Sequence, residues 1–304
     1  MSWILITIIA YLLFSITFLI DKYILVGSAI DPGVYTFYVA LLGLAVFLFI
    51  PFVGFYLPDS GHLFFALLSG MTFIPALFLF NTLLSRFEPS RVVPAVGGIL
   101  PIFILIFGFI ISPDQISPSF QQLVSLILLI MGSILINYKA HPESKTDLQM
   151  WKMIIISSAL FALASLSSKY AFNDQKFLVI LIWMRVGAFL MSLFFWLDKD
   201  TRKKISDSAK TALPQKAKGL FAFNQLMGAT SNILLNWAVS IVPIGLVAIV
   251  NAMQGIENAF LFLFSVMLSK KLPAIFQEDL SFKTILQKVL AILLIGSGLI
   301  ILSV

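Results

Sequence analysis

The chain has 304 residues, of which 60% are hydrophobic and 11% charged, with a formal net charge of +6 and no cysteine. A soluble domain averages about 45–50% apolar and roughly 25% charged residues, so this chain has too few polar residues to cover its surface in water. The composition excludes a disulfide-stapled module, a thiolate-ligated zinc protein and a cysteine nucleophile. It predicts an integral membrane protein of the all-α class.

Ten apolar runs follow one another along the chain. A run of about 20 apolar residues crosses a bilayer as a helix, because hydrocarbon cannot hydrogen-bond the backbone. Brief turns such as Asp31-Pro32-Gly33 make consecutive helices antiparallel neighbours. The predicted spans are Trp3 to Ile20, Gly33 to Phe55, Leu63 to Leu84, Val92 to Ile111, Phe120 to Asn137, Trp151 to Phe172, Phe177 to Leu197, Gly219 to Ser240, Ile244 to Leu268 and Thr284 to Leu302.

The connections from Tyr138 to Met150, Asp198 to Lys218 and Ser269 to Lys283 are longer and polar. The last of them carries apolar residues that suit a short helix in the membrane interface, namely Leu272, Ile275, Phe276 and Leu280. Most Lys and Arg residues follow odd-numbered spans, in short clusters typical of membrane topology signals rather than of nucleic-acid binding. Because short basic loops stay cytoplasmic, we expect both termini outside, in a plasma (inner) membrane.

The two halves of the chain repeat each other. Residues 12 to 23 read LLFSITFLIDKY and residues 159 to 170 read ALFALASLSSKY. Asn81 aligns with Asn236, and LLIMGS at 128 to 133 aligns with LLIGS at 293 to 297. Five is an odd number of spans, so the second copy would enter the membrane from the opposite side. We therefore expect two inverted five-helix repeats, at 1–140 and 151–304, joined by a linker at 141–150.

The ordered set of features resembles the drug/metabolite transporter superfamily, specifically its EamA-like branch. It comprises ten short spans in a 5+5 duplication, Lys22 and Lys169 closing span 1 and its repeat, Pro101 within LPIF of span 4, and the Gly-Ser tails of spans 5 and 10. The resemblance covers essentially the whole chain and implies an exporter or exchanger of small metabolites with a central cavity. Members of this branch often carry an Arg early in span 2, where this chain has Tyr38, which aligns with Arg185 of the second half. The family's members usually have inside termini, whereas the basic clusters of this chain predict outside termini.

Two charged residues fall near the middle of predicted spans, Arg185 in span 7 and Glu257 in span 9. A charge at the bilayer centre costs about 2.5–3.5 kcal/mol and needs a partner or a cavity. Polar residues share one face of span 9 and one face of span 8, given about 100° per residue. We predict a midplane substrate pocket formed by Arg185, Glu257, Asn251, Gln254, Asn258, Gln225, Asn232, Asn236 and the first-half counterparts Tyr38 and Asn81.

Structural alternatives stay open for these residues. Arg185 and Glu257 could form an ion pair, and the amides could join helices for packing alone. Lys22 and Lys169 lie at helix ends, where we expect their stems to snorkel toward water. His62 and His141 fall in loops, remote from carboxylate clusters, so no metal or other cofactor is expected.

The sequence favours a secondary active transporter of a small polar metabolite, working by alternating access. Arg185 would bind a carboxylate, while Glu257 would meet an amine or carry a coupling proton, which suits an amino-acid-like zwitterion. No ATP-binding motif is present, so a gradient or a counter-substrate would supply the energy. The alternatives are a lipid flippase of the same architecture and, less favoured, a membrane-embedded enzyme, for which HExxH, GxSxG and paired carboxylates are missing. The sequence indicates no oligomeric state.

Overall fold

The computed structural model describes residues 2–28, 31–87, 89–115, 118–136, 148–210, 215–269 and 281–303. Within these ranges the regular structure is helical throughout and contains no strand, which confirms the predicted all-α class. Its α-helices are α1 (Ser2–Ser28), α2 (Pro32–Gly43), α3 (Ile50–Val53), α4 (Ser60–Arg86), α5 (Pro89–Ile111), α6 (Phe120–Ile136), α7 (Leu148–Phe172), α8 (Phe177–Ser192), α9 (Lys199–Lys210), α10 (Gln215–Ile241), α11 (Val247–Ala252), α12 (Gln254–Ser269) and α13 (Phe282–Ser303). Short 3-10 segments, η1 (Leu44–Phe49), η2 (Pro113–Gln115), η3 (Leu193–Trp196) and η4 (Ile244–Leu246), extend or connect them.

Seven segments of the described chain are long and apolar enough to cross a membrane, which indicates an integral membrane protein. They are Ser2–Asp21, Pro32–Val53, Ser60–Arg86, Leu148–Phe172, Phe177–Trp196, Ile244–Phe264 and Lys283–Ile301. Two of the other three predicted spans correspond to shorter apolar stretches, Ala95–Ile111 and Phe120–Leu135. The third is α10, which is less apolar because amide side chains interrupt it.

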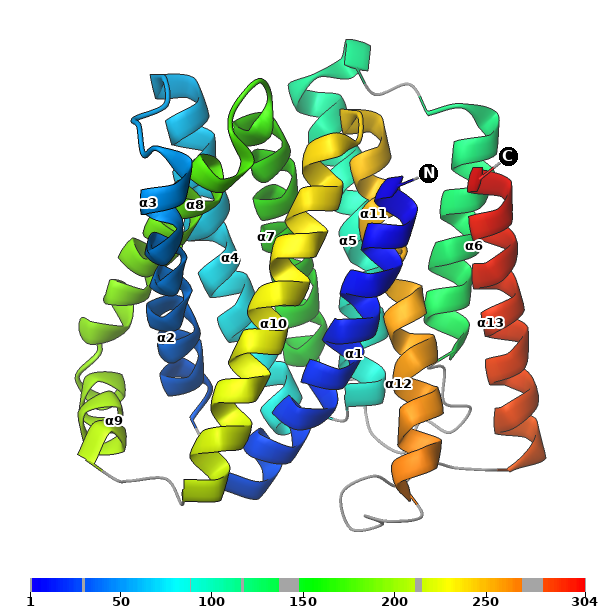
Figure 1. Cartoon of the computed structure of the whole chain (residues 1–304). Helices are drawn as coiled ribbons and strands as arrows, with labels where there is room; N and C mark the ends of the chain where they lie inside the picture. The colour runs from blue at the N-terminus through cyan, green and yellow to red at the C-terminus, as the bar shows by residue number, and fades with distance from the viewer. Residues whose placement is uncertain are drawn as a thin grey trace.

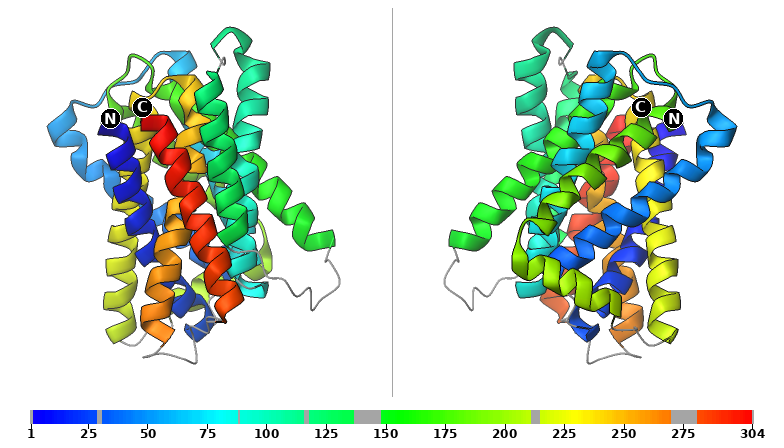
Figure 2. Two further views of the ribbon diagram at one scale, coloured as in Figure 1. Left: turned by 90° about the vertical axis from the view of Figure 1, so that its right-hand side faces the viewer. Right: turned by 90° about the vertical axis from the view of Figure 1, so that its left-hand side faces the viewer.

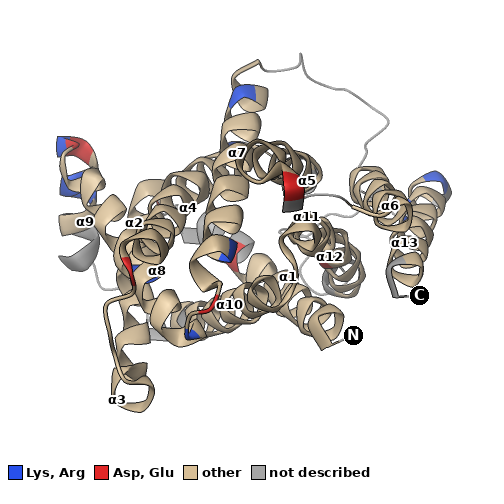
Figure 3. Ribbon diagram, turned by 90° about the horizontal axis from the view of Figure 1, so that it is seen from above, with Lys and Arg blue, Asp and Glu red and all other residues tan. Residues whose placement is uncertain are grey.

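The helices form a bundle whose long members run alternately in opposite directions, and both marked ends of the chain lie at the same end of it (Figures 1 and 2). Helix α4 packs against α7 and α8, α1 packs against α10 and α12, and α6 packs against α13. Viewed from above, nearly all of the described ribbon is neither acidic nor basic (Figure 3). Large apolar side chains such as Phe52, Ile110 and Phe120 are exposed, as expected for a surface that faces lipid.

Helices α4 and α8 meet backbone to backbone at two glycines. A Cβ atom added to Gly70 would lie 1.9 Å from the carbonyl oxygen of Met184, and one added to Gly187 would lie 2.3 Å from the carbonyl oxygen of Leu67. Small residues allow such close approach between membrane helices, where van der Waals packing takes the place of hydrophobic burial. The crossing of α4 and α8 therefore depends on glycine at both positions.

We expect Gly70→Ala to destabilise the protein, because the new methyl group meets backbone that cannot rotate away. Overpacking of this kind costs about 1–3 kcal/mol, which a melting curve of the purified protein in detergent will detect. Gly296→Ala on α13 is the matched control, since nothing lies within 4 Å of a Cβ there. The control should leave the melting temperature unchanged or raise it, because Ala favours a helix over Gly by roughly 0.5–1 kcal/mol. Equal melting temperatures for the two variants would contradict the close contact.

The connection predicted from Asp198 to Lys218 contains helix α9, whose formation the composition did not indicate. Its single large apolar residue, Ile205, is buried against Val34 and Phe37 at the start of α2. The predicted interfacial helix around Leu272, Ile275, Phe276 and Leu280 and most of the 141–150 linker lie outside the described residues.

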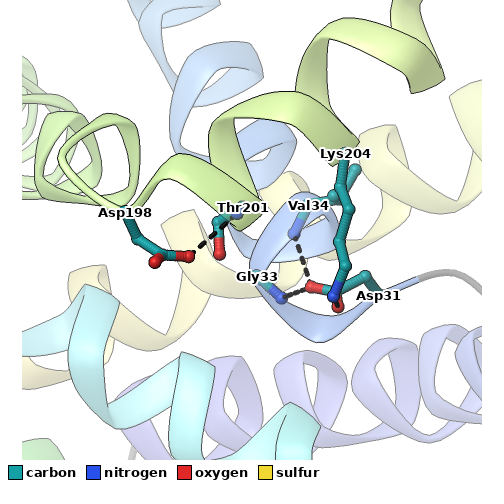
Figure 4. Close-up of polar contacts among 6 residues, drawn as sticks. All are labelled: Asp31, Gly33, Val34, Asp198, Thr201 and Lys204. Carbon is teal, nitrogen blue, oxygen red and sulfur yellow. Dashed lines mark hydrogen bonds and ion pairs between the residues drawn. The ribbon is translucent and has the colours of Figure 1, made fainter.

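Asp31 joins α9 to the beginning of α2 (Figure 4). Its Oδ1 atom accepts hydrogen bonds from the backbone N–H groups of Gly33 at 2.9 Å and Val34 at 3.4 Å, which caps α2. Its Oδ2 atom accepts a hydrogen bond from Nζ of Lys204 at 2.7 Å. Partial burial of the Asp31 carboxyl opposes ionisation, but the bonds from Lys204 and Gly33 outweigh it and hold the pKa of Asp31 below its ordinary value.

We expect Asp31→Ala to cost about 0.5–2 kcal/mol, because it removes the cap of α2, whereas Asp31→Asn keeps a capping oxygen and loses the exposed ion pair, worth about 0–1 kcal/mol. Since the folded-state pKa of Asp31 is lowered, the stability that it contributes is complete above the ordinary aspartate pKa of about 3.9 and is lost as the pH falls through the folded-state value. The difference in melting temperature between wild type and Asp31→Ala should therefore shrink on acidification below about pH 4. A difference that does not change with pH would show that the ionised carboxylate adds nothing.

Candidate functional site

Arg185 lies at the meeting point of three helices. Its Nη2 atom, on α8, donates a hydrogen bond to Oδ1 of Asn232 on α10. Asn236, one turn further along α10, donates from Nδ2 to the same Oδ1 atom at 2.9 Å. A Cβ atom added to Gly43 at the end of α2 would lie 3.3 Å from Cδ of Arg185, so the arginine stem packs on that glycine. A guanidinium has five N–H donors and the bond to Asn232 uses one of them, which leaves donors for an anionic group.

Glu257 is 6% exposed and lies in the first turn of α12. The side chain of Gln254, on the same helix, interacts with its carboxylate. Gln254 in turn fills the space above Gly97 of α5, where an added Cβ atom would lie 2.8 Å from its Oε1 atom. No ion pair joins Glu257 to Arg185 within the described part of the chain. The structure therefore holds two membrane-embedded ionisable side chains that do not pair with each other.

The ninth predicted span, Ile244 to Leu268, is divided at Met253 into α11 and α12. The hydroxyl of Tyr11 on α1 donates to the carbonyl oxygens of Val250 at 3.2 Å and Asn251 at 3.3 Å, directly before the break. Nδ2 of Asn251 donates to Oγ of Ser165 on α7 at 2.9 Å. The break is thus held by helices from both halves of the chain.

The remaining predicted site residues contact several different helices. Nδ2 of Asn258 donates to Oγ of Ser133 on α6 at 3.2 Å, and Nδ2 of Asn81 donates to Oγ1 of Thr36 on α2 at 3.1 Å. Both amides are buried, and these bonds match the packing alternative for them. Tyr38 is half-buried on α2. The structure brings Arg185, Asn232 and Asn236 together, and it places Glu257 with Gln254 in a second group.

A third polar group escaped the sequence analysis. The hydroxyl of Tyr35 on α2 donates a hydrogen bond to Oδ1 of Asp21, near the end of α1. Nδ2 of Asn224 on α10 donates to the same Oδ1 atom at 2.5 Å, and Nε2 of Gln225 donates to the Tyr35 hydroxyl at 3.3 Å. Asp21 directly follows the first apolar run, and a charged residue at that place is typical of the start of a loop, so the sequence does not indicate a buried site there. The signal that could have found it is the Asn-Gln pair in span 8.

Lys169 does not snorkel as predicted. Its side chain is 8% exposed, and its Nζ atom donates to the backbone carbonyl oxygen of Ser240 at 2.9 Å, in the last turn of α10. The negative end of the helix dipole favours a cation at this place. The side chain of Lys22, with which Lys169 aligns in the sequence, lies outside the described part. Among the described residues, no three His, Asp or Glu side chains are grouped so that they could hold a metal ion.

No protein-family model and no curated protein matches the chain. A solved structure described only as "Crystal structure of protein" aligns with 99% of this chain and 96% of its own, with a TM-score of 0.66 and 14% sequence identity. At this identity the likeness concerns the fold alone. The shared fold extends over nearly the whole length of both chains.

We expect Tyr11→Phe to loosen the helix break, because it removes the hydroxyl that binds the carbonyls of Val250 and Asn251. The loss of a buried hydrogen bond costs about 0.5–1.5 kcal/mol. Amide hydrogen exchange of peptides covering residues 247–257 should therefore become faster. Tyr170→Phe, which removes a hydroxyl bonded to Ser112, is the matched control and should leave exchange in 247–257 unchanged. Equal exchange in the two variants would show that Tyr11 does not hold the break.

Proposed function

We propose that the chain is a secondary active transporter of the EamA-like type, an exporter or exchanger of a small polar metabolite. The observation that carries the proposal is the pair of membrane-embedded ionisable residues, Arg185 and Glu257, each of which contacts an amide side chain instead of an opposite charge. Ionisable residues inside membrane-spanning segments are rare and mark substrate or ion pathways.

The pairing of helices supports the inverted repeat within this proposal. In the duplication, α1, α2, α4, α5 and α6 correspond to α7, α8, α10, α11–α12 and α13. The contact of α1 with α10 then matches that of α7 with α4, and the contact of α1 with α12 matches that of α7 with α5. Both chain ends lie at one end of the bundle, as an even number of crossings requires (Figure 1). Helices α5, α6 and α10 would supply the remaining three of ten spans.

Two helix contacts that the duplication would make equivalent differ strongly in extent. Helices α4 and α8 pack extensively across Gly70 and Gly187, whereas their counterparts α10 and α2 are in contact far less extensively. At α10 and α2 the contact includes the rings of Tyr35 and Phe221, whose centroids are 6.1 Å apart. An inverted-repeat transporter needs such a difference, because alternating access exchanges the tight and the loose arrangement between its halves.

The chemistry of the two charged groups indicates the substrate class. The remaining N–H donors of Arg185 suit a carboxylate, which guanidinium binds through two parallel hydrogen bonds. Glu257 suits an amine, or a proton if it works as the coupling group. A zwitterion of the amino-acid type carries both of these groups, and the amides at Asn232 and Gln254 would bind its polar atoms.

We expect Arg185→Ala and Glu257→Gln each to reduce transport tenfold or more, because each removes a charge-assisted hydrogen bond worth about 1.5–3 kcal/mol. A melting-shift screen of amino acids, sugars and nucleosides would first select the solute, and uptake of that labelled solute into proteoliposomes would then be measured. Asp200→Asn and Lys203→Ala, both on the exposed face of α9, are matched charge-removing controls and should transport normally.

Normal transport by both site variants would overturn the proposed site. Chemical conversion of the solute by the purified protein would instead favour an embedded enzyme, and movement of a labelled lipid between leaflets would favour a flippase.

A further inference from the structure

The group around Asp21 is separate from the residues used above, apart from Gln225, which reaches its edge. It lies where α1, α2 and α10 meet, and it closes the first membrane-spanning segment, Ser2–Asp21. Tyr35 is 4% exposed and Asn224 is fully buried. A carboxyl group in this position is an intramembrane acid on the helix pair, α2 and α10, whose contact the proposed transport cycle would change.

The hydrogen bonds between Asp21 and its neighbours leave two oxygen atoms unused, one on Asp21 and one on Asn224. The Tyr35 hydroxyl and Nδ2 of Asn224 both donate to Oδ1, so neither bond uses Oδ2 of the carboxyl group. The other end of the same amide, Oδ1 of Asn224, is buried and has no hydrogen-bond partner among the described residues. A buried hydrogen-bond acceptor without a donor costs free energy of folding. Among all the residues that the structure describes, Asn224 is the one side chain that carries such an atom.

The missing partner is a donor, and a carboxyl group gains a donor when it is protonated. A carboxylic acid and a primary amide can pair through two parallel hydrogen bonds. The existing bond from Nδ2 of Asn224 to Oδ1 of Asp21 is one of them. A proton on Oδ2 of Asp21, donated to Oδ1 of Asn224, would be the other, and it would satisfy the buried amide oxygen.

The described residues around Asp21 offer no cation to an ionised carboxylate, which agrees with a neutral carboxyl group. Tyr35 on α2 and Asn224 and Gln225 on α10 are uncharged, and Asp31, before α2, is paired with Lys204. On α12 the acid Glu257 lies close to Tyr11, which precedes Asp21 on α1 by about three helical turns. On α4 the ionisable residues His62 and Arg86 lie in the terminal turns. Asp21 forms no ion pair with a described residue. The side chains of Lys22, Lys216 and Lys218 lie outside the described part.

We propose that Asp21 and Asn224 form a proton-binding site, with the proton held between Oδ2 of Asp21 and Oδ1 of Asn224, and that its release is coupled to transport. The coupling part rests on the proposed function. Loss of the proton would leave a charge and an unpaired acceptor at the contact of α1, α2 and α10, which weakens that contact. The repeat places Ser168 where the first half has Asp21, so the site belongs to one half only.

Infrared spectroscopy tests the proton directly, without any need for transport. Purified protein in lipid at neutral pH should show the carbonyl stretch of a protonated carboxylic acid, and Asp21→Asn should remove one such component. Asp200→Asn, an exposed acid on α9, is the matched control and should remove none. Asn224→Leu retains the acid and should shift the band to higher frequency, so it gives a second reading if Asp21→Asn does not fold. A spectrum that neither Asp21→Asn nor Asn224→Leu alters would overturn the proposal.

Transport assays test the coupling. Asp21→Asn imitates the permanently protonated state, so exchange of solute across proteoliposomes should stay within about twofold of wild type while accumulation driven by a pH gradient is lost. Retained accumulation, or loss of both activities, would overturn the coupling. If Na⁺ raised the melting temperature of wild type but not of Asp21→Asn, and no carboxylic acid band were present, a metal cation would replace the proton. A positive infrared result in a protein that moves no solute would keep the proton site and reject the proposed function.

Discussion

Every polar side chain inside this bundle has to find its partner within the protein, because hydrocarbon offers none. Most of its buried amides meet this requirement by joining helices, as Asn81 does with Thr36 and Asn258 with Ser133. Arg185 and Asn224 are different, since the bond to Asn232 uses one of the five N–H donors of Arg185 and Oδ1 of Asn224 has no hydrogen-bond partner among the described residues. Amides whose hydrogen bonds are complete thus join helices, whereas groups with unused hydrogen-bonding atoms are those for which a function is proposed.

Local properties of the sequence predicted much of this molecule, and properties that depend on helix rotation escaped it. The helical class, the membrane location and the positions of Arg185 and Glu257 follow from the length and content of apolar runs. The partners of these residues do not, because a sequence does not fix which face of a helix meets which neighbour. The break at Met253 was missed for a related reason, since the carbonyls there are held by Tyr11, more than two hundred residues earlier.

Asp21 and Lys169 show the same limit at helix ends. Lys169 is predicted to snorkel from a helix end and Asp21 follows the predicted span Trp3 to Ile20, so the sequence indicates no partner inside the bundle for either residue. The structure buries Lys169 on the carbonyl of Ser240 and surrounds Asp21 with Tyr35 and Asn224. Helix α1 continues beyond Asp21 to Ser28, and the partners of the two residues lie on α2 and α10, which only the packed bundle brings against them.

The glycine crossing of α4 and α8 also determines what can move. No side chain separates the two backbones at Gly70, so rotamer changes cannot loosen the crossing. The hydroxyls of Ser69 and Ser157 further bind α4 to α7, at 2.8 Å and 3.0 Å from backbone carbonyls of the facing helix. The three helices therefore form one tightly packed unit, which can open at the α4–α8 crossing only if the helix backbones themselves separate. Arg185, two residues before Gly187, links this unit to α10 through its hydrogen bond to Asn232.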